Sequence, residues 1–174
     1  MAFKSSIRFK QFDIKKIRRE LAKLQKTEVK WGWINHKKYP ISDKNGRGGV
    51  YVASIATANN FGGYAKGYKT NAMTYIPARP YFEQAIEMSK QFNELESEAM
   101  FHRVLCQLPY KHILKGIGDT NAEYIKKSIA MQNMAKLSPK AVAIKGNSQQ
   151  WDDTGLLIRS ISASVKYVRN VKGG

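Results

Sequence analysis

The 174-residue chain has one cysteine, Cys106, and only 13 acidic residues against 30 lysines and arginines. A single cysteine can form neither an internal disulfide nor a cysteine-based zinc cluster. Because Cys106 lies among apolar residues of a predicted helix, we expect it to be buried and inert. No apolar run approaches the roughly 18 residues that cross a bilayer, so we expect no membrane partner. The first residues lack the apolar run of a secretory signal. The lone cysteine fits a reducing cytoplasm.

Motifs of catalysis and metal binding are also missing. The sequence has no G-x-S-x-G, no Walker loop, no H-E-x-x-H and no paired cysteines. Its histidines, His36, His102 and His112, are too widely spaced to clamp a metal from one helical face, so we expect each at the surface or in packing. The sequence therefore predicts no catalytic residue, no metal, no cofactor and no enzymatic activity.

Positive charge is abundant and unevenly distributed. The net charge is +17, of which residues 1–47 carry +10, residues 48–100 carry −1 and residues 101–174 carry +8. Basic surface attracts polyanions such as DNA, RNA or an acidic protein face. We therefore expect the two ends of the chain to meet a polyanionic or acidic partner.

The first basic segment has the pattern of an amphipathic helix over residues 12–26. Asp13 is a suitable N-cap, and apolar residues recur at helical steps from Ile14 to Leu24. The apolar stripe can pack inward while the basic side faces a partner. The candidate contacts to DNA or to an acidic partner are Lys15, Lys16, Arg18, Arg19 and Lys23, with Lys37 and Lys38 in the loop over 36–49.

Periodicity predicts further helices and strands. Helical spacing predicts helices over 50–60, 80–108, from 119 onward and 138–144, and alternation predicts strands over 28–35 and 161–167. Pro80 suits the first position of the long helix, which should end before Pro109. We divide the chain into a basic arm and helix over 1–27, an α+β domain over 28–168 and a basic tail over 169–174.

Residues 61–76 read FGGYAKGYKTNAMTYI and show no periodicity, which predicts an extended functional loop. Tyrosines among lysines could stack on bases. They are also enriched at protein interfaces, and we favour an interface because nothing here resembles an ordered base-binding platform. The candidate interface residues of this loop are Tyr64, Lys66, Tyr68, Lys69 and Tyr75.

The loop is followed by Pro77-Ala78-Arg79-Pro80. The two prolines should fix the angle at which the chain enters the long helix. We expect Arg79 between them to point outward and to form an ion pair within the chain or with a second subunit, and we count it among the interface candidates.

Four segments together resemble a known family. They are Ile55-Ala56 with Asn59-Asn60-Phe61-Gly62; residues 76–82; Ile117-Gly118 with residues 125–129; and residues 137–161, which include Asp153-Thr154-Gly155-Leu156-Leu157. Their order and spacing resemble the tail-completion and neck (virion morphogenesis) proteins of tailed bacteriophages, over about residues 50–168. Asn60 stands where that family usually has an acid.

The resemblance implies an α+β fold with a small antiparallel sheet flanked by helices, one long helix and extended interface loops. It also implies a non-enzymatic virion protein, assembled in the host cytoplasm, that forms a ring at the head–tail junction. Such a ring would contain six copies, or twelve against a connector, and would meet the connector or adaptor, the tail tube or sheath and the passing genomic DNA. The alternative is a sequence-independent nucleic-acid-binding protein. The sequence leaves open whether the basic ends face DNA or protein.

Overall fold

The computed structural model describes residues 13–42, 47–66, 73–131, 133–139, 142–143 and 155–167. Within these residues the expected α+β class is confirmed. One small antiparallel sheet was expected, and the described residues form two, each of two strands. In chain order the elements are α1 (Ile14–Gln25), β1 (Thr27–Gly32), α2 (Val52–Phe61), β2 (Gly63–Lys66), β3 (Met73–Ile76), α3 (Tyr81–Leu105), α4 (Lys111–Ala130), α6 (Leu156–Arg159) and β4 (Ser162–Tyr167).

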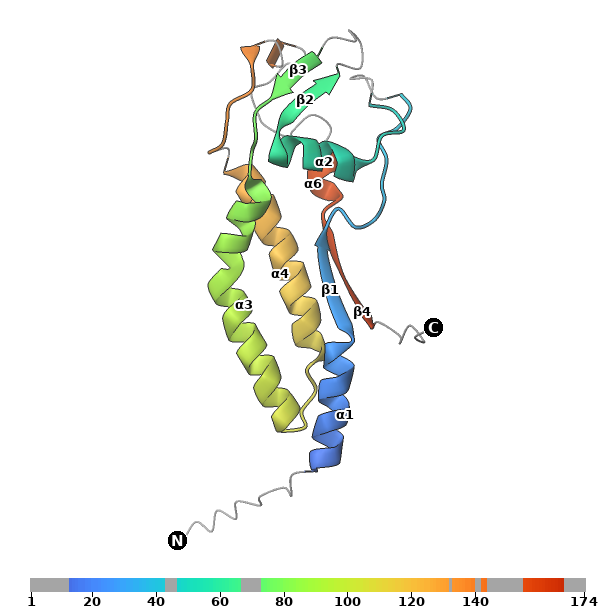
Figure 1. The fold of residues 1–174 in the computed structure, drawn as a ribbon, viewed down its shortest axis with the longest axis vertical. Helices are drawn as coiled ribbons and strands as arrows, with labels where there is room; N and C mark the ends of the chain where they lie inside the picture. Colours follow the sequence, from blue (N-terminus) through green and yellow to red (C-terminus); the bar gives the residue numbers. More distant parts are fainter. Residues whose placement is uncertain are drawn as a thin grey trace, which may run out of the picture.

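The elongated body is built in layers, with α4 between α3 and the sheet of β1 and β4 (Figure 1). β1 and β4 are antiparallel and pair from Thr27 with Tyr167 to Gly32 with Ser162. Gly118 lets α4 approach this sheet, because a Cβ there would lie 3.0 Å from the Ala163 Cβ and 3.1 Å from Val29 Cγ1. The Ile117-Gly118 motif therefore has a packing role.

Polar side chains fix the register of α3 against α4. Asn93 and Asn121 exchange two hydrogen bonds, of 3.0 Å and 2.7 Å, and Ser128 donates to Gln84 Oε1 at 2.8 Å. Because buried polar groups are costly unless they are paired, these bonds favour one sliding position of the two helices.

The apolar core has two parts. The lower part, at the α1 end of the molecule, contains Val104, Tyr110 and Leu114, with Leu21 and Leu24 of α1 packed against it. The upper part joins α2, the start of α3, the second half of α4 and α6. Its buried members include Val52, Ala56, Tyr81, Ile125, Ile129 and Leu157.

Several predicted elements are confirmed. α1 lies within the predicted 12–26, and Lys16 N donates to Asp13 Oδ1 at 3.0 Å, which confirms the predicted N-cap. α2, β1 and β4 also occupy the predicted regions. The long helix differs slightly from the prediction: Pro80, predicted at its first position, is its N-cap, and the helix runs from Tyr81 to Leu105, three residues short of the predicted end.

Two predicted boundaries are wrong. The helix expected from residue 119 begins at Lys111, and Asp119 lies inside α4. Residues 61–76 were expected to be an aperiodic loop, but they contain β2 and β3. The alternation there is only four residues long on each strand and is interrupted between them, so it gave too short a signal.

Cys106 was expected to be buried and is exposed. It is the C-cap of α3, where the chain leaves the helix, and Gln107 follows with a φ of 58°. The expected continuation of α3 to Leu108 had placed Cys106 on an inward face. The three histidines are at the surface, as predicted.

Candidate functional site

The β2–β3 hairpin, residues 63–66 and 73–76, stands at one end of the molecule above α2 (Figure 1). Tyr64 and Tyr75 are directly opposite each other, with ring centroids 5.4 Å apart. Their side chains are 74% and 60% exposed, and the neighbouring Met73 is 64% exposed. A two-stranded hairpin is marginally stable by itself, and large apolar side chains rarely gather on an unpartnered surface. The hairpin therefore carries a cluster of exposed aromatic and apolar side chains that the described residues leave uncovered.

The structure brings three of the predicted interface residues together on this hairpin: Tyr64, Lys66 and Tyr75. Tyr68 and Lys69 lie outside the described residues.

The base of the hairpin is tightly built at Gly62. Its φ is 69°, and a Cβ there would lie 2.6 Å from the Ala78 nitrogen and 2.7 Å from the Ile76 oxygen. Only glycine can occupy this position without moving the backbone. Gly62 thus allows the start of the hairpin to pack closely on the residues just before α3.

Asn60 joins α2 to the start of α3. Its side chain is 4% exposed, accepts a hydrogen bond from Phe82 N at 3.1 Å, and donates to Glu83 Oε1 and Oε2 at 3.1 Å and 3.0 Å. Asn60 therefore caps α3 from another helix. A carboxylate at this position would face that of Glu83, so the amide of Asn60 suits its place beside Glu83.

The prediction that Arg79 points outward is wrong, because its side chain is only 4% exposed. Arg79 Nε donates to the Ala135 oxygen at 2.9 Å, and a second nitrogen donates to Asn59 Oδ1 at 3.3 Å. Burial lowers the pKa of the guanidinium below its usual value. The partners of Arg79 that the structure shows are oxygens of carbonyl groups, which accept its several donors without a buried carboxylate. Almost none of its surface is left for a second subunit.

Tyr81 also connects α2 to the start of α3. Its hydroxyl donates to the Ala56 oxygen at 2.6 Å, and the side chain is 1% exposed. Burial, with the nearby Glu83 carboxylate as a smaller cause, raises the pKa of the Tyr81 hydroxyl far above its usual value. We call Asn59, Asn60, Arg79 and Tyr81 the polar joint. No pattern in the sequence predicted this joint, although the motifs that carried the resemblance contain all four residues.

The predicted basic contact residues separate into two groups. Lys15, Lys16, Arg18, Arg19 and Lys23 lie on α1 at the lower end of the molecule in Figure 1. Lys37 and Lys38 lie beyond the other end of β1, and the Lys38 ammonium is 4.6 Å from the centre of the Tyr51 ring. The structure therefore does not form one continuous basic surface from all seven residues.

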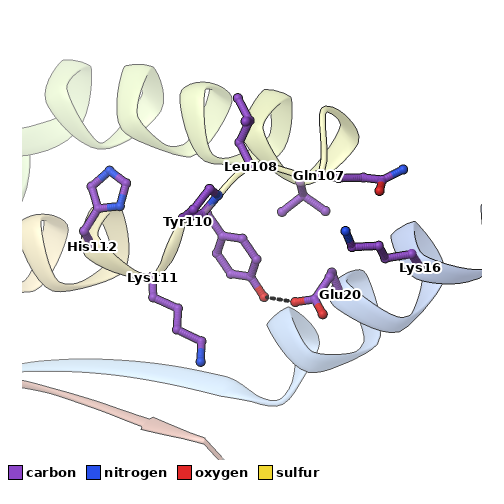
Figure 2. Close-up of a pocket in the computed structure, with 9 residues that line it drawn as sticks. Lys16, Glu20, Gln107, Leu108, Tyr110, Lys111 and His112 are labelled. Carbon is purple, nitrogen blue, oxygen red and sulfur yellow. Dashed lines mark hydrogen bonds between the residues drawn. The ribbon is translucent and has the colours of Figure 1, made fainter. Parts of the chain in front are cut away.

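A groove of about 320 Å³ lies between α1 and the turn that joins α3 to α4 (Figure 2). Across it the Tyr110 hydroxyl donates to Glu20 Oε2 at 3.2 Å, and Lys23 Nζ lies 2.6 Å from Glu20 Oε1. The hydrogen bond from Lys23 is the main cause that lowers the pKa of Glu20. Glu20 thus attaches α1 to the body. The single acid within the basic α1 was the sequence signal that could have suggested this role.

Comparisons with known proteins identify no relative: no family model matches the chain, and neither a curated protein nor a solved structure is detectably similar. Within the described ranges, no three His, Cys, Asp or Glu side chains are grouped so that they could hold a metal ion. No helix in those ranges is both long and apolar enough to cross a membrane.

Proposed function

We propose that this chain is a structural subunit of a bacteriophage head–tail junction. It would form a ring that completes the tail and joins it to the head, with DNA passing through. The observation that carries the proposal is the β2–β3 hairpin, whose Tyr64 and Tyr75 are 74% and 60% exposed. The residues that resemble phage neck proteins hold the base of that hairpin. An exposed hairpin on a rigid base suits a subunit that reaches onto a neighbour in a closed ring. We call β2 and β3 the β2–β3 arm.

A second candidate is sequence-independent binding of nucleic acid. The basic residues of α1 support it, since all five predicted contacts on that helix are exposed. The two functions differ in their response to salt. A dedicated nucleic-acid-binding protein should bind free duplex with an affinity that falls steeply as salt rises, because each phosphate contact releases counterions. A ring subunit should bind free duplex weakly.

The variant Y64S/Y75S, which changes both exposed tyrosines of the β2–β3 arm, tests the leading proposal. Both side chains are exposed, so the subunit should fold, while its incorporation into phage particles should fall at least tenfold. Quantitative mass spectrometry of purified particles measures this against other virion proteins. The matched control is Ile41→Ser, which removes an apolar side chain that is 94% exposed outside the arm. Particles that incorporate Y64S/Y75S as well as the control would contradict the assembly role of the arm.

A further inference from the structure

The outer face of α3 carries a line of acidic residues. Glu87, Glu94 and Glu98 are exposed and, at 100° per residue, lie within a narrow arc of the helix. Glu98 approaches His102 on the same helix at 3.9 Å. In the part of the chain that the structure describes, Glu87 and Glu94 have no cationic side chain within 4.0 Å. Unpaired acids are unexpected in a protein with a net charge of +17. We call these three residues the acidic stripe.

The outer face of α1 carries a line of the opposite charge. Lys15 and Arg19 of α1 and Lys26, its C-cap, are exposed. At 100° per residue they share one side, away from Leu21 and Leu24, which pack on the lower core. None of the three has an acidic side chain within 4.0 Å among the described residues. We call Lys15, Arg19 and Lys26 the basic stripe.

The two stripes match in spacing when the helices run antiparallel. Along α1 the steps are 4 and 7 residues, and along α3 they are 7 and 4. At 1.5 Å per residue, both patterns place charges about 6 Å and about 10.5 Å apart. Antiparallel packing then sets Lys15 opposite Glu98, Arg19 opposite Glu94 and Lys26 opposite Glu87.

The stripes of one subunit form no ion pair with each other among the described residues. α1 lies at the lower end of the molecule and contacts α3 there (Figure 1). The stripes instead face outward, and the apolar face of α1 is the face that packs on its own subunit. A head-to-tail contact that repeats around a ring requires two different, complementary patches on one chain, and stripes of opposite charge are such a pair.

We propose that the basic stripe of one copy of this chain docks on the acidic stripe of α3 of the next copy. The proposal rests on the ring function above and names one of its contacts. A second copy explains both stripes together, whereas DNA would account for the basic stripe and would be repelled by the acidic one.

Charge reversal with rescue tests the docking. Sedimentation velocity at low ionic strength should show salt-sensitive self-association of the wild-type protein. The variants E87K/E94K/E98K and K15E/R19E/K26E should each weaken it at least tenfold. The variant with all six changes should recover most of the association, because both stripes are reversed. The control K37E/K115E/K166E makes the same change of net charge as K15E/R19E/K26E, but at exposed lysines elsewhere, and should associate better than that variant.

Cross-linking of the wild-type protein gives a second measurement that needs no variant. A zero-length carbodiimide reagent joins lysine to glutamate only in contact, and a mixture of normal and ¹⁵N-labelled subunits identifies links between copies. We expect mixed links from Lys15 to Glu98 and from Lys26 to Glu87.

The docking would be overturned if those mixed links were absent. It would also be overturned if the variant with all six changes associated no better than the triple variants. A basic stripe whose reversal abolishes duplex binding without changing self-association would assign it to DNA instead. The ring function fails on a different result, namely absence of the chain from purified particles.

Discussion

The polar joint and the β2–β3 arm are adjacent in the chain and use tyrosine in opposite ways. In the joint, Tyr81 is 1% exposed and its hydroxyl is hydrogen-bonded inside the subunit. In the β2–β3 arm, Tyr64 is 74% exposed, and among the described residues the only aromatic ring in contact with its own is that of Tyr75. The difference shows where the fold is already complete and where surface remains for another molecule. Changes in the joint should affect stability, and changes in the arm should affect assembly.

The largest expected effect is that of Arg79→Met. It removes the buried guanidinium, which is 4% exposed, and with it the hydrogen bonds to Ala135 and Asn59 that connect distant parts of the chain. We expect the free energy of unfolding to fall by about 3 kcal/mol. Urea denaturation measures it. Arg103→Met is the matched control, because Arg103 also donates to a carbonyl oxygen but at an exposed site, and it should cost less than about 1 kcal/mol. Equal losses would remove the distinction between the joint and the surface.

Asn60→Asp should cost about 2 kcal/mol at neutral pH, because it places a carboxylate against Glu83. The like charges raise the pKa of the pair in the folded state, so the deficit should shrink as the pH falls through that raised pKa. Stability measured against pH would show this. Adding Glu83→Gln should recover most of the loss at neutral pH. A deficit that is independent of pH would show that the side chain fails for a steric reason.

Tyr81→Phe and Tyr64→Phe compare the two regions with the same chemical change. Loss of the hydroxyl that donates to Ala56 should cost about 1.5 kcal/mol. The change at the exposed Tyr64 should cost almost nothing. Thermal unfolding of both variants measures the contrast. A loss at Tyr64 as large as that at Tyr81 would mean that the arm is part of the folded core.

The smallest effect concerns Glu20, which connects α1 to Tyr110. Its pKa is lowered in the folded state, so it stabilises the protein above the unfolded pKa, and that contribution is lost as the pH falls through the folded value. Because the group is near the surface, we expect only a few tenths of a kcal/mol. Glu20→Gln should remove this contribution to the pH dependence of the free energy of unfolding, measured below pH 5. An unchanged pH dependence would assign it to other carboxylates.

The sequence predicted helices better than it predicted contacts. The stripe of α1 and its Asp13 cap were readable because a helix leaves a periodic signal over many residues. The hairpin strands are four residues long and left too short a signal. Arg79 was misplaced for a different reason. Its burial depends on carbonyl groups of residues 135 and 136, which lie more than 50 positions away along the chain.

The candidate site was predicted in part. Tyr64 and Tyr75 were identified by composition alone, because tyrosines in a glycine-rich segment are typical of interfaces. Their exact pairing across two strands was not predicted, since register depends on where the turn falls. Asn60 and Tyr81 were visible only as members of a motif, and their partners are set by the packing of α2 on α3.

The central claim is that the chain is a building block of a phage particle, located where head and tail meet. Electron microscopy of purified particles that carry a labelled subunit tests it most directly. The account predicts label in a ring at the head–tail junction, with intact particles reduced when the Y64S/Y75S subunit replaces the wild type. Particles that contain no label, or label at another position in the virion, would contradict it.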